Sequence, residues 1–320
     1  MKKAVILINL GTPDSPDSKG VRRFLREFLA DRRVVEMSRW LWYPILYLII
    51  LPFRSPKVAK KYQPLWTIGD SPLRVFSLQL ADALRLEMTQ FDCGVELAMT
   101  YGKPSLTEVL DKFQSEGVEQ LFFIPLFPQY SATTSAAAMD KVADYFRGQR
   151  RLPSWSWVRD YHDQPRYIEA LADTVRQHWS ESGRSEFLLM SFHGIPQRNV
   201  DLGDPYQEQC QRTAKLLAQT LKLEDVEWQM SFQSRPGKAQ WLQPYTDKTV
   251  QALAERGIKS LDIVAPSFAT DCLETLEELD TEAAETFYEA GGEKFSYIPC
   301  LNSNKKHVSV LTELVGRHVH

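Results

Sequence analysis

Short, continuous apolar runs recur along the chain, and each is followed by a longer segment with helical periodicity. Runs without alternation of polar and apolar residues are typical of parallel strands that helices cover on both faces. The pattern therefore predicts an α/β fold with doubly wound parallel sheets. The predicted strands span residues 4–9, 95–100, 121–126, 156–160, 187–192, 227–232, 261–265 and 295–299.

The length of the chain, 320 residues, favours two fused domains of ordinary size. A short echo supports two related halves, because Ile8–Pro13 and Ser191–Pro196 are both apolar runs broken by Gly and Pro. The best candidate for a boundary is the stretch Arg150–Pro153. The predicted parts are a first domain of residues 1–150, a second domain of 151–304 and a final helix of 305–320 that packs back on the first domain.

Charge and motifs exclude several classes of function. With 38 Lys and Arg against 41 Asp and Glu, the chain has no basic field that would bind nucleic acid. It contains neither G-x-G-x-x-G nor G-x-x-x-x-G-K-[ST], so we expect no nucleotide partner. The four cysteines form no C-x-x-C, which argues against a zinc ribbon and fits a reducing, cytoplasmic location.

The segment from Trp40 to Phe53, here called the apolar segment, carries no charge. It is too short to span a bilayer, which takes about 20 apolar residues, and it contains Pro44. Basic flanks favour a segment that lies against anionic headgroups, but a buried core helix has the same apolar length and stays an alternative. The flanking basic residues are Arg39, Arg54, Lys57, Lys60 and Lys61.

His193 directly follows the apolar run Phe187–Phe192 and precedes Gly194, which places it at the carboxyl end of a predicted strand. Ligands of α/β sheets bind at this edge. No Ser or Cys nucleophile arrangement surrounds His193, so the sharper hypothesis is a base or a metal ligand. A hydrogen-bonded structural histidine is the alternative.

Between Lys259 and Lys294 the chain is rich in carboxylates and contains no Lys, Arg or His. A helix that starts near Thr270 would place five of the carboxylates on one face, because they recur at spacings of three and four. Like charges at these spacings repel one another. The acidic series, as we call it, consists of Asp271, Glu274, Glu278, Glu282 and Glu285.

Two interpretations of the acidic series stay open. In the first, the acidic series is the solvated face of a surface helix, whose apolar residues lie nearly opposite and face the core. In the second, the acidic series is part of a functional site. The second interpretation follows from its place, since it begins just after the predicted strand 261–265, at the sheet edge that holds His193. An imidazole and a carboxylate across a cleft can bind a divalent metal or pass protons, and further carboxylates lead outward. The opposite apolar residues are Leu273, Leu276, Leu279, Ala283 and Phe287.

Six segments, in order along nearly the whole chain, resemble the ferrochelatases. Together they are far more specific than any single motif. The segments are Asn9–Pro13, Gly69–Leu73, Pro125–Ser131, Ser191–Pro196, Phe232–Arg235 and Asp271–Glu278.

The resemblance implies insertion of Fe(II) into protoporphyrin IX to give protoheme with release of two protons, the terminal step of heme biosynthesis. It also implies two similar Rossmann-like domains of the type II chelatase kind, with the macrocycle in the cleft between them. His193 and Glu274 would be the catalytic residues and the metal ligands, and Glu278 and Glu282 would continue a path for protons or metal. The implied porphyrin-binding residues are Leu10, Tyr101, Ser131 and Phe268.

In this family the apolar segment resembles a hydrophobic lip that contacts the membrane where a water-insoluble substrate enters. The resemblance therefore implies a protein that is cytoplasmic and peripheral on the inner face of the cytoplasmic membrane. The predicted lip residues are Trp40, Trp42, Leu46, Leu48, Ile49 and Phe53.

The chain departs from the family pattern at two places. Cys272 stands where many relatives carry His, so a direct metal role of that position is in doubt. Relatives with a [2Fe-2S] cluster use a C-terminal cysteine group and a cysteine at the position of Ala132, so we expect no cluster. No permanently bound cofactor is expected, and Fe(II) is a substrate.

Two other functions remain as alternatives. A non-catalytic carrier of heme or another tetrapyrrole would need the apolar segment but not the acidic series. A related chelatase that loads cobalt or nickel into a more carboxylated tetrapyrrole would act on a water-soluble substrate and would not need the apolar segment.

Overall fold

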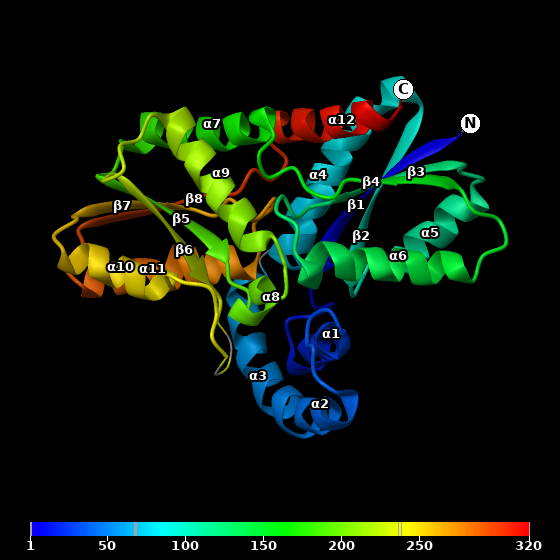
Figure 1. Ribbon diagram of the computed structural model, residues 1–320, viewed down its shortest axis with the longest axis horizontal. Coiled ribbons are helices and arrows are strands. Elements are labelled where there is room, and N and C mark those ends of the chain that lie inside the picture. The colour runs from blue at the N-terminus through cyan, green and yellow to red at the C-terminus, as the bar shows by residue number, and fades with distance from the viewer. Residues whose placement is uncertain (1, 67–68, 236, 238, 320) are drawn as a thin grey trace. The chain divides into compact units, whose positions relative to one another are not determined.

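The computed structural model describes residues 2–66, 69–235, 237 and 239–319, and the chain divides into two compact units (Figure 1). Each unit contains one four-stranded sheet whose strands are all parallel. This confirms the predicted α/β class with parallel sheets. The first unit comprises residues 1–127, 131–159 and 303–320, and the second comprises 128–130 and 160–302.

The sheet of the first unit has the order β2-β1-β3-β4. Because β1 lies in the interior, the strand order reverses between β1 and β3, and such a switch point is where α/β sheets bind ligands. The first unit extends to Arg159 rather than to residue 150, because β4 pairs with β3 through Gln120 and Ser154. The strands are β1 (Lys3–Gly11), β2 (Cys93–Tyr101), β3 (Gln120–Pro125) and β4 (Ser154–Trp157).

Helices cover both faces of this sheet (Figure 1). Ala4, Ile6 and Ile8 of β1 pack against α5 and α6, while α4 and α12 contact each other and the strands from the other side. The final helix therefore belongs to the first unit. The helices are α1 (Ser18–Ala30), α2 (Arg39–Ile45), η1 (Leu46–Ile50), α3 (Leu51–Tyr62), η2 (Gln63–Leu65), α4 (Pro72–Met88), η3 (Thr89–Phe91), α5 (Leu106–Ser115), η4 (Ala132–Ala136), α6 (Ala137–Arg147) and α12 (Lys305–Val319).

The sheet of the second unit has the corresponding order, β6-β5-β7-β8, with its switch point between β5 and β7. Leu189 of β5 and Ile263 of β7 pack against Leu253 of α10 and Phe287 of α11. The strands are β5 (Phe187–His193), β6 (Trp228–Gln233), β7 (Ser260–Val264) and β8 (Lys294–Ile298). The helices are α7 (Pro165–Ser182), α8 (Gln197–Asp201), α9 (Tyr206–Leu221), α10 (Thr246–Glu255), η5 (Glu274–Glu282) and α11 (Ala283–Glu289).

Candidate active site

His193 is the last residue of β5, and its side chain is half-buried at the carboxyl end of the second unit's sheet. Its Nδ1 lies 2.6 Å from the carbonyl oxygen of Gly194. A carbonyl only accepts hydrogen bonds, so this contact assigns the proton of a neutral ring to Nδ1. Nε2 then keeps its lone pair for a proton or a metal.

The loop after β7 leads to the same sheet edge. β5 and β7 are adjacent in the sheet, with Met190 opposite Val264, and the strand order reverses between them. The rings of His193 and Phe268 lie 6.1 Å apart between centroids, and Ser267 Oγ accepts a 3.1 Å hydrogen bond from the backbone N–H of His193. The loop therefore holds an aromatic side chain beside the histidine at the switch point.

The acidic residues after this loop lie on η5, a π-helix, where the sequence predicts an ordinary α-helix. A π-helix closes i→i+5 hydrogen bonds and has a wider turn, so residues four apart stay on nearly the same side. Glu274 and Glu278 are half-buried, whereas Glu282 is exposed. Along η5, two partly shielded carboxylates are thus followed by one that is open to solvent.

Glu278 links the acidic residues to the surroundings of His193. Ser234 Oγ donates a hydrogen bond to Glu278 Oε2, and Gln233 Nε2 lies 3.4 Å from the same oxygen. Burial raises the pKa of Glu278 above its ordinary value, and the charge of Glu274 adds to the shift, while Ser234, His193 and Gln233 oppose it. The carboxyl group therefore keeps its proton to a higher pH than an exposed glutamate does.

Glu274 is the first residue of η5 and lies close to Cys272. Its backbone carbonyl accepts a 2.9 Å hydrogen bond from Gln233 Nε2. Burial raises the pKa of the Cys272 thiol well above its ordinary value, and the negative charge of Glu274 raises it further. Cys272 therefore stays a neutral thiol beside Glu274, which is not the form that binds metals.

Asp271 differs from the other members of the acidic series, because it is a structural residue. It precedes η5, and only 2% of its surface is exposed. Its carboxylate accepts hydrogen bonds from Tyr297 Oη, from Thr275 Oγ1 at 3.0 Å and from Asn302 Nδ2 at 2.6 Å. The expectation that Asp271 shares one helix face with the later carboxylates is wrong, since these donors hold it inside the second unit.

In the second unit, Phe268 lies beside His193, and Glu278 lies near enough to His193 and Glu274 for both charges to act on its pKa. The sequence pattern assigned no role to Gln233 and Ser234, although both touch this cluster. Their signal in the sequence is their position directly after the predicted strand 227–232, at the sheet edge that carries His193.

Three predicted porphyrin-binding residues belong to the first unit. Leu10, in β1, is half-buried, and Ser131 is buried as the cap of η4 after β3. Both flank the switch point of the first sheet. Tyr101 is enclosed, because its hydroxyl donates to Asp31 Oδ2 at 2.9 Å and Lys141 Nζ lies 4.3 Å from its ring centroid. Its side chain, 1% exposed, does not face solvent.

The apolar segment forms α2, η1 and the start of α3, and most of its large side chains are exposed. Trp40, Leu48 and Phe53 are 91%, 73% and 69% exposed. Two predicted lip residues point inward instead: Leu46 is fully buried, and Trp42 is half-buried with its Nε1 donating to a main-chain carbonyl at 2.7 Å. In the described part of the chain, no helix has the length and hydropathy needed to cross a membrane.

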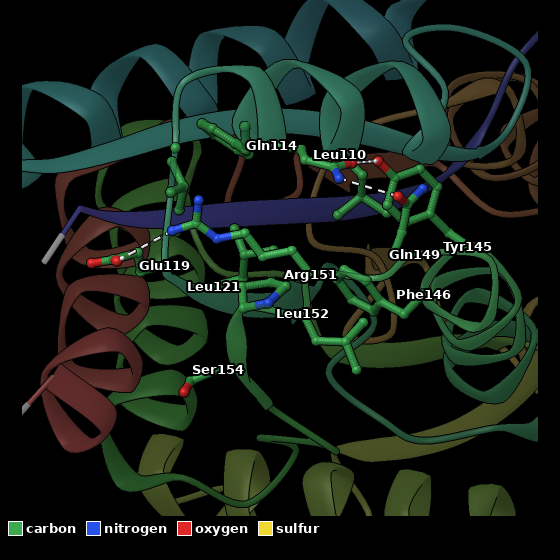
Figure 2. A pocket seen from close by; sticks show the side chains of 14 residues that line it. Leu110, Gln114, Glu119, Leu121, Tyr145, Phe146, Gln149, Arg151, Leu152 and Ser154 are labelled. Carbon is green, nitrogen blue, oxygen red and sulfur yellow. Dashed lines mark hydrogen bonds and ion pairs between the residues drawn. The ribbon is translucent and has the colours of Figure 1, made fainter.

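The first unit also contains a cavity of about 260 Å³, shown in Figure 2. Its walls come from the ends of α5 and α6, from the start of β3 at Leu121 and from the start of β4 at Ser154. It therefore lies at the amino ends of the strands, opposite the edge where α/β sheets bind ligands.

Among the described residues, no three His, Cys, Asp or Glu side chains form a group that could hold a metal ion.

A family model and the curated relatives give the same family, and a solved structure has a similar fold. A family model described as Ferrochelatase matches residues 2–319. A ferrochelatase of Aeromonas hydrophila is 51% identical over 99% of this chain and 99% of its own length, and one of Vibrio parahaemolyticus is 50% identical over 98% and 97%. The fold is similar to that of SirB from Bacillus subtilis with Fe3+, with a TM-score of 0.59 and 12% identity over 100% of this chain and 96% of the other.

Proposed function

The chain belongs to the ferrochelatase family, and we propose that His193, Glu274 and Glu278 carry out the insertion of Fe(II) into protoporphyrin IX. The reaction is the terminal step of heme biosynthesis, and it replaces two pyrrole protons of the macrocycle by the metal. The site must therefore remove two protons and deliver one dication. The observation that supports the assignment is that Glu278 is half-buried where the charges of both His193, at the edge of the second sheet, and Glu274 act on its pKa.

His193 is the proposed base. With Nδ1 donating to the Gly194 carbonyl, the Nε2 lone pair of His193 can take a pyrrole proton. Glu278, whose pKa burial raises, can accept that proton because its protonated form is stabilised in this environment. Glu282, which is exposed, would then release the proton to water.

Glu274 is the proposed ligand that receives Fe(II), and His193 would share the metal only while its Nε2 carries no pyrrole proton. Carboxylate oxygen and imidazole nitrogen suit a divalent iron of intermediate softness. The neutral Cys272 thiol beside Glu274 is not assigned to the metal.

Porphyrin contacts are proposed for Leu10 and Phe268, which are half-buried, whereas Ser131, like Tyr101, is only 1% exposed. Phe268 is the member whose place relative to His193 is defined, with 6.1 Å between the ring centroids. An aromatic ring there can pack against the macrocycle and help to hold it in a bent shape, which exposes the pyrrole lone pairs.

The activity and the roles are tested together under anaerobic conditions. The purified protein, given Fe(II) and protoporphyrin IX, should form heme, and the H193A and E274Q variants should lose turnover by about 100-fold or more, as expected when a general base or a charge-stabilising group is removed. Wild-type turnover in both variants would refute the roles. Tight porphyrin binding without metal insertion would instead indicate a carrier, and faster turnover of a more carboxylated porphyrin would change the assigned substrate.

We also propose that the exposed side chains of the apolar segment contact a membrane surface. Large exposed apolar side chains grouped on one part of a protein mark interaction sites, and the basic residues around them fit anionic headgroups. Leu48→Asp should weaken binding to vesicles with anionic lipids by about tenfold, which corresponds to about 1.4 kcal/mol. Leu86→Asp is the matched control, since Leu86 is 78% exposed on α4. Equal binding of the two variants would contradict the proposal.

A further inference from the structure

Ser234 has an uncommon backbone conformation. Among the described residues, four non-glycine residues have a left-handed φ: Asp92, Lys222, Ser234 and Asn302. Asp92 and Lys222 cap the ends of η3 and α9, where this conformation is common, and Asn tolerates it. Ser234, with a φ of 60°, directly follows β6 and needs another explanation.

The conformation of Ser234 places its hydroxyl on the site. Ser234 Oγ donates to Glu278 Oε2. The preceding residue, Gln233, supports the same helix turn, because its Nε2 donates to the Glu274 carbonyl at 2.9 Å. Two consecutive residues at the end of β6 thus hold two consecutive positions of the acidic path.

The residues on both sides of Ser234 are anchored. The Gln233 carbonyl accepts a 2.8 Å hydrogen bond from the Gly194 N–H, beside His193. On the other side, the Arg235 guanidinium lies 4.2 Å from the ring centroid of Tyr245 and forms an ion pair with Asp247. An unfavourable φ persists only where the surroundings enforce it, and such residues cluster at functional sites.

We propose that Ser234 is a positioning residue of the reaction. Its hydroxyl fixes the Glu278 carboxylate in the position from which it accepts the proton of His193 and acts beside Glu274. A glutamate side chain has several rotatable bonds, so a free carboxylate would spend most of its time elsewhere. When the hydroxyl holds the carboxylate in one geometry, the entropy of ordering the side chain is not lost anew in each proton transfer. The inference rests on the proposed function, since it requires Glu278 to act in the site.

The test separates the hydroxyl from the backbone conformation. Ser234→Gly keeps the left-handed φ and removes the donor. Ser234→Asn and Ser234→Asp form a second pair: both side chains tolerate this conformation, but only Asn supplies a donor to Glu278. Lys222→Gly is the control, because it relieves a left-handed residue at the end of α9, outside the cluster.

The measurements are anaerobic kcat with Fe(II), porphyrin affinity by fluorescence and thermal melting. We expect S234G and S234D to lower kcat about tenfold while porphyrin affinity stays unchanged, as expected for loss of orientation rather than of binding. S234N should restore most of the turnover, and K222G should match the wild type. In the double variant S234G/E278Q, kcat should equal that of E278Q alone, because Ser234 acts through Glu278.

The outcomes distinguish this inference from the proposed function. Wild-type turnover in S234G with an impaired E278Q would overturn the role of Ser234 alone, and so would losses that multiply in the double variant. Wild-type turnover in E278Q would overturn both the acidic path and Ser234. If S234G fails to fold, equal turnover of S234N and S234D overturns the inference, and a clear loss in S234D alone supports it.

Discussion

Replacement of Asp271 by Asn should destabilise the second unit without removing any group from the proposed reaction. The carboxylate is buried, and Oδ1 accepts from Tyr297 Oη, Thr275 Oγ1 and the Cys300 N–H, while Oδ2 accepts from Asn302 Nδ2. These bonds join the start of η5 to the loop after β8.

An amide cannot satisfy the same partners. If the new oxygen takes the place of Oδ1, the new NH₂ faces Asn302 Nδ2, which is also a donor. Asn302 cannot reverse its own amide, because its Oδ1 already accepts from the Asp271 N–H at 2.8 Å. One hydrogen bond to a charged group, about 2 kcal/mol, is lost, and the three others weaken to neutral bonds. The expected loss in free energy of unfolding is about 3 kcal/mol.

Urea unfolding followed by pulsed hydrogen exchange of peptides measures this loss, because peptides of the second unit report it separately from the first. E274Q is the matched control: the change from carboxylate to amide is the same, but the group is half-buried and should cost stability below about 1 kcal/mol. If D271N unfolds within about 1 kcal/mol of the wild type, the structural role of the carboxylate is refuted.

Three further predictions concern pH, thiols and packing. The pKa of Glu278 is raised above 4.5, so the folded state keeps this proton to a higher pH than the unfolded chain does. Wild-type stability should therefore fall as the pH rises from about 5 through the raised pKa. Thermal melts of E278Q should lack this decline, and parallel stability curves of the two proteins would contradict the prediction. All four cysteines are buried, and burial raises the pKa of Cys93 to about 11. The thiols should therefore react slowly with a thiol reagent at about pH 8 until urea unfolds the chain. Fast labelling of the folded protein would contradict this prediction. Leu46→Ala should cost about 3 kcal/mol in urea unfolding and Leu48→Ala less than about 0.5 kcal/mol, and similarly small losses in both variants would contradict the burial of Leu46.

The strands were predictable from the sequence because buried parallel strands need continuous apolar runs, and each of the eight runs forms one. The fourth strand starts at Ser154, two residues before the predicted start at residue 156. The apolar pattern missed Ser154 and Trp155, because both are exposed at the edge of the sheet. The pairing of β4 with β3 also explains why the first unit extends to Arg159.

Other features of the site left no such pattern. The spacing of four between Glu274, Glu278 and Glu282 fits an α-helix and a π-helix alike, so the sequence could not distinguish the π-helix of η5. Burial separates Asp271 from Glu274, but both carry the same charge in the sequence. The role of Ser234 depends on a backbone φ that the residue type does not indicate.

The two units show how similar backbones come to differ in chemistry. In both, the order of the sheet reverses between the first and third strands, and a π-helix follows the third strand, η4 after β3 and η5 after β7. The sequence of η4 is Ala-Thr-Thr-Ser-Ala, without charge, whereas η5 carries Glu at four of its positions, 274, 277, 278 and 282. Iron and protons are cations, so carboxylates on η5 can attract them, and the neutral η4 cannot. The backbone provides a ligand edge in each unit, and we infer that the side chains assign iron and protons to the second.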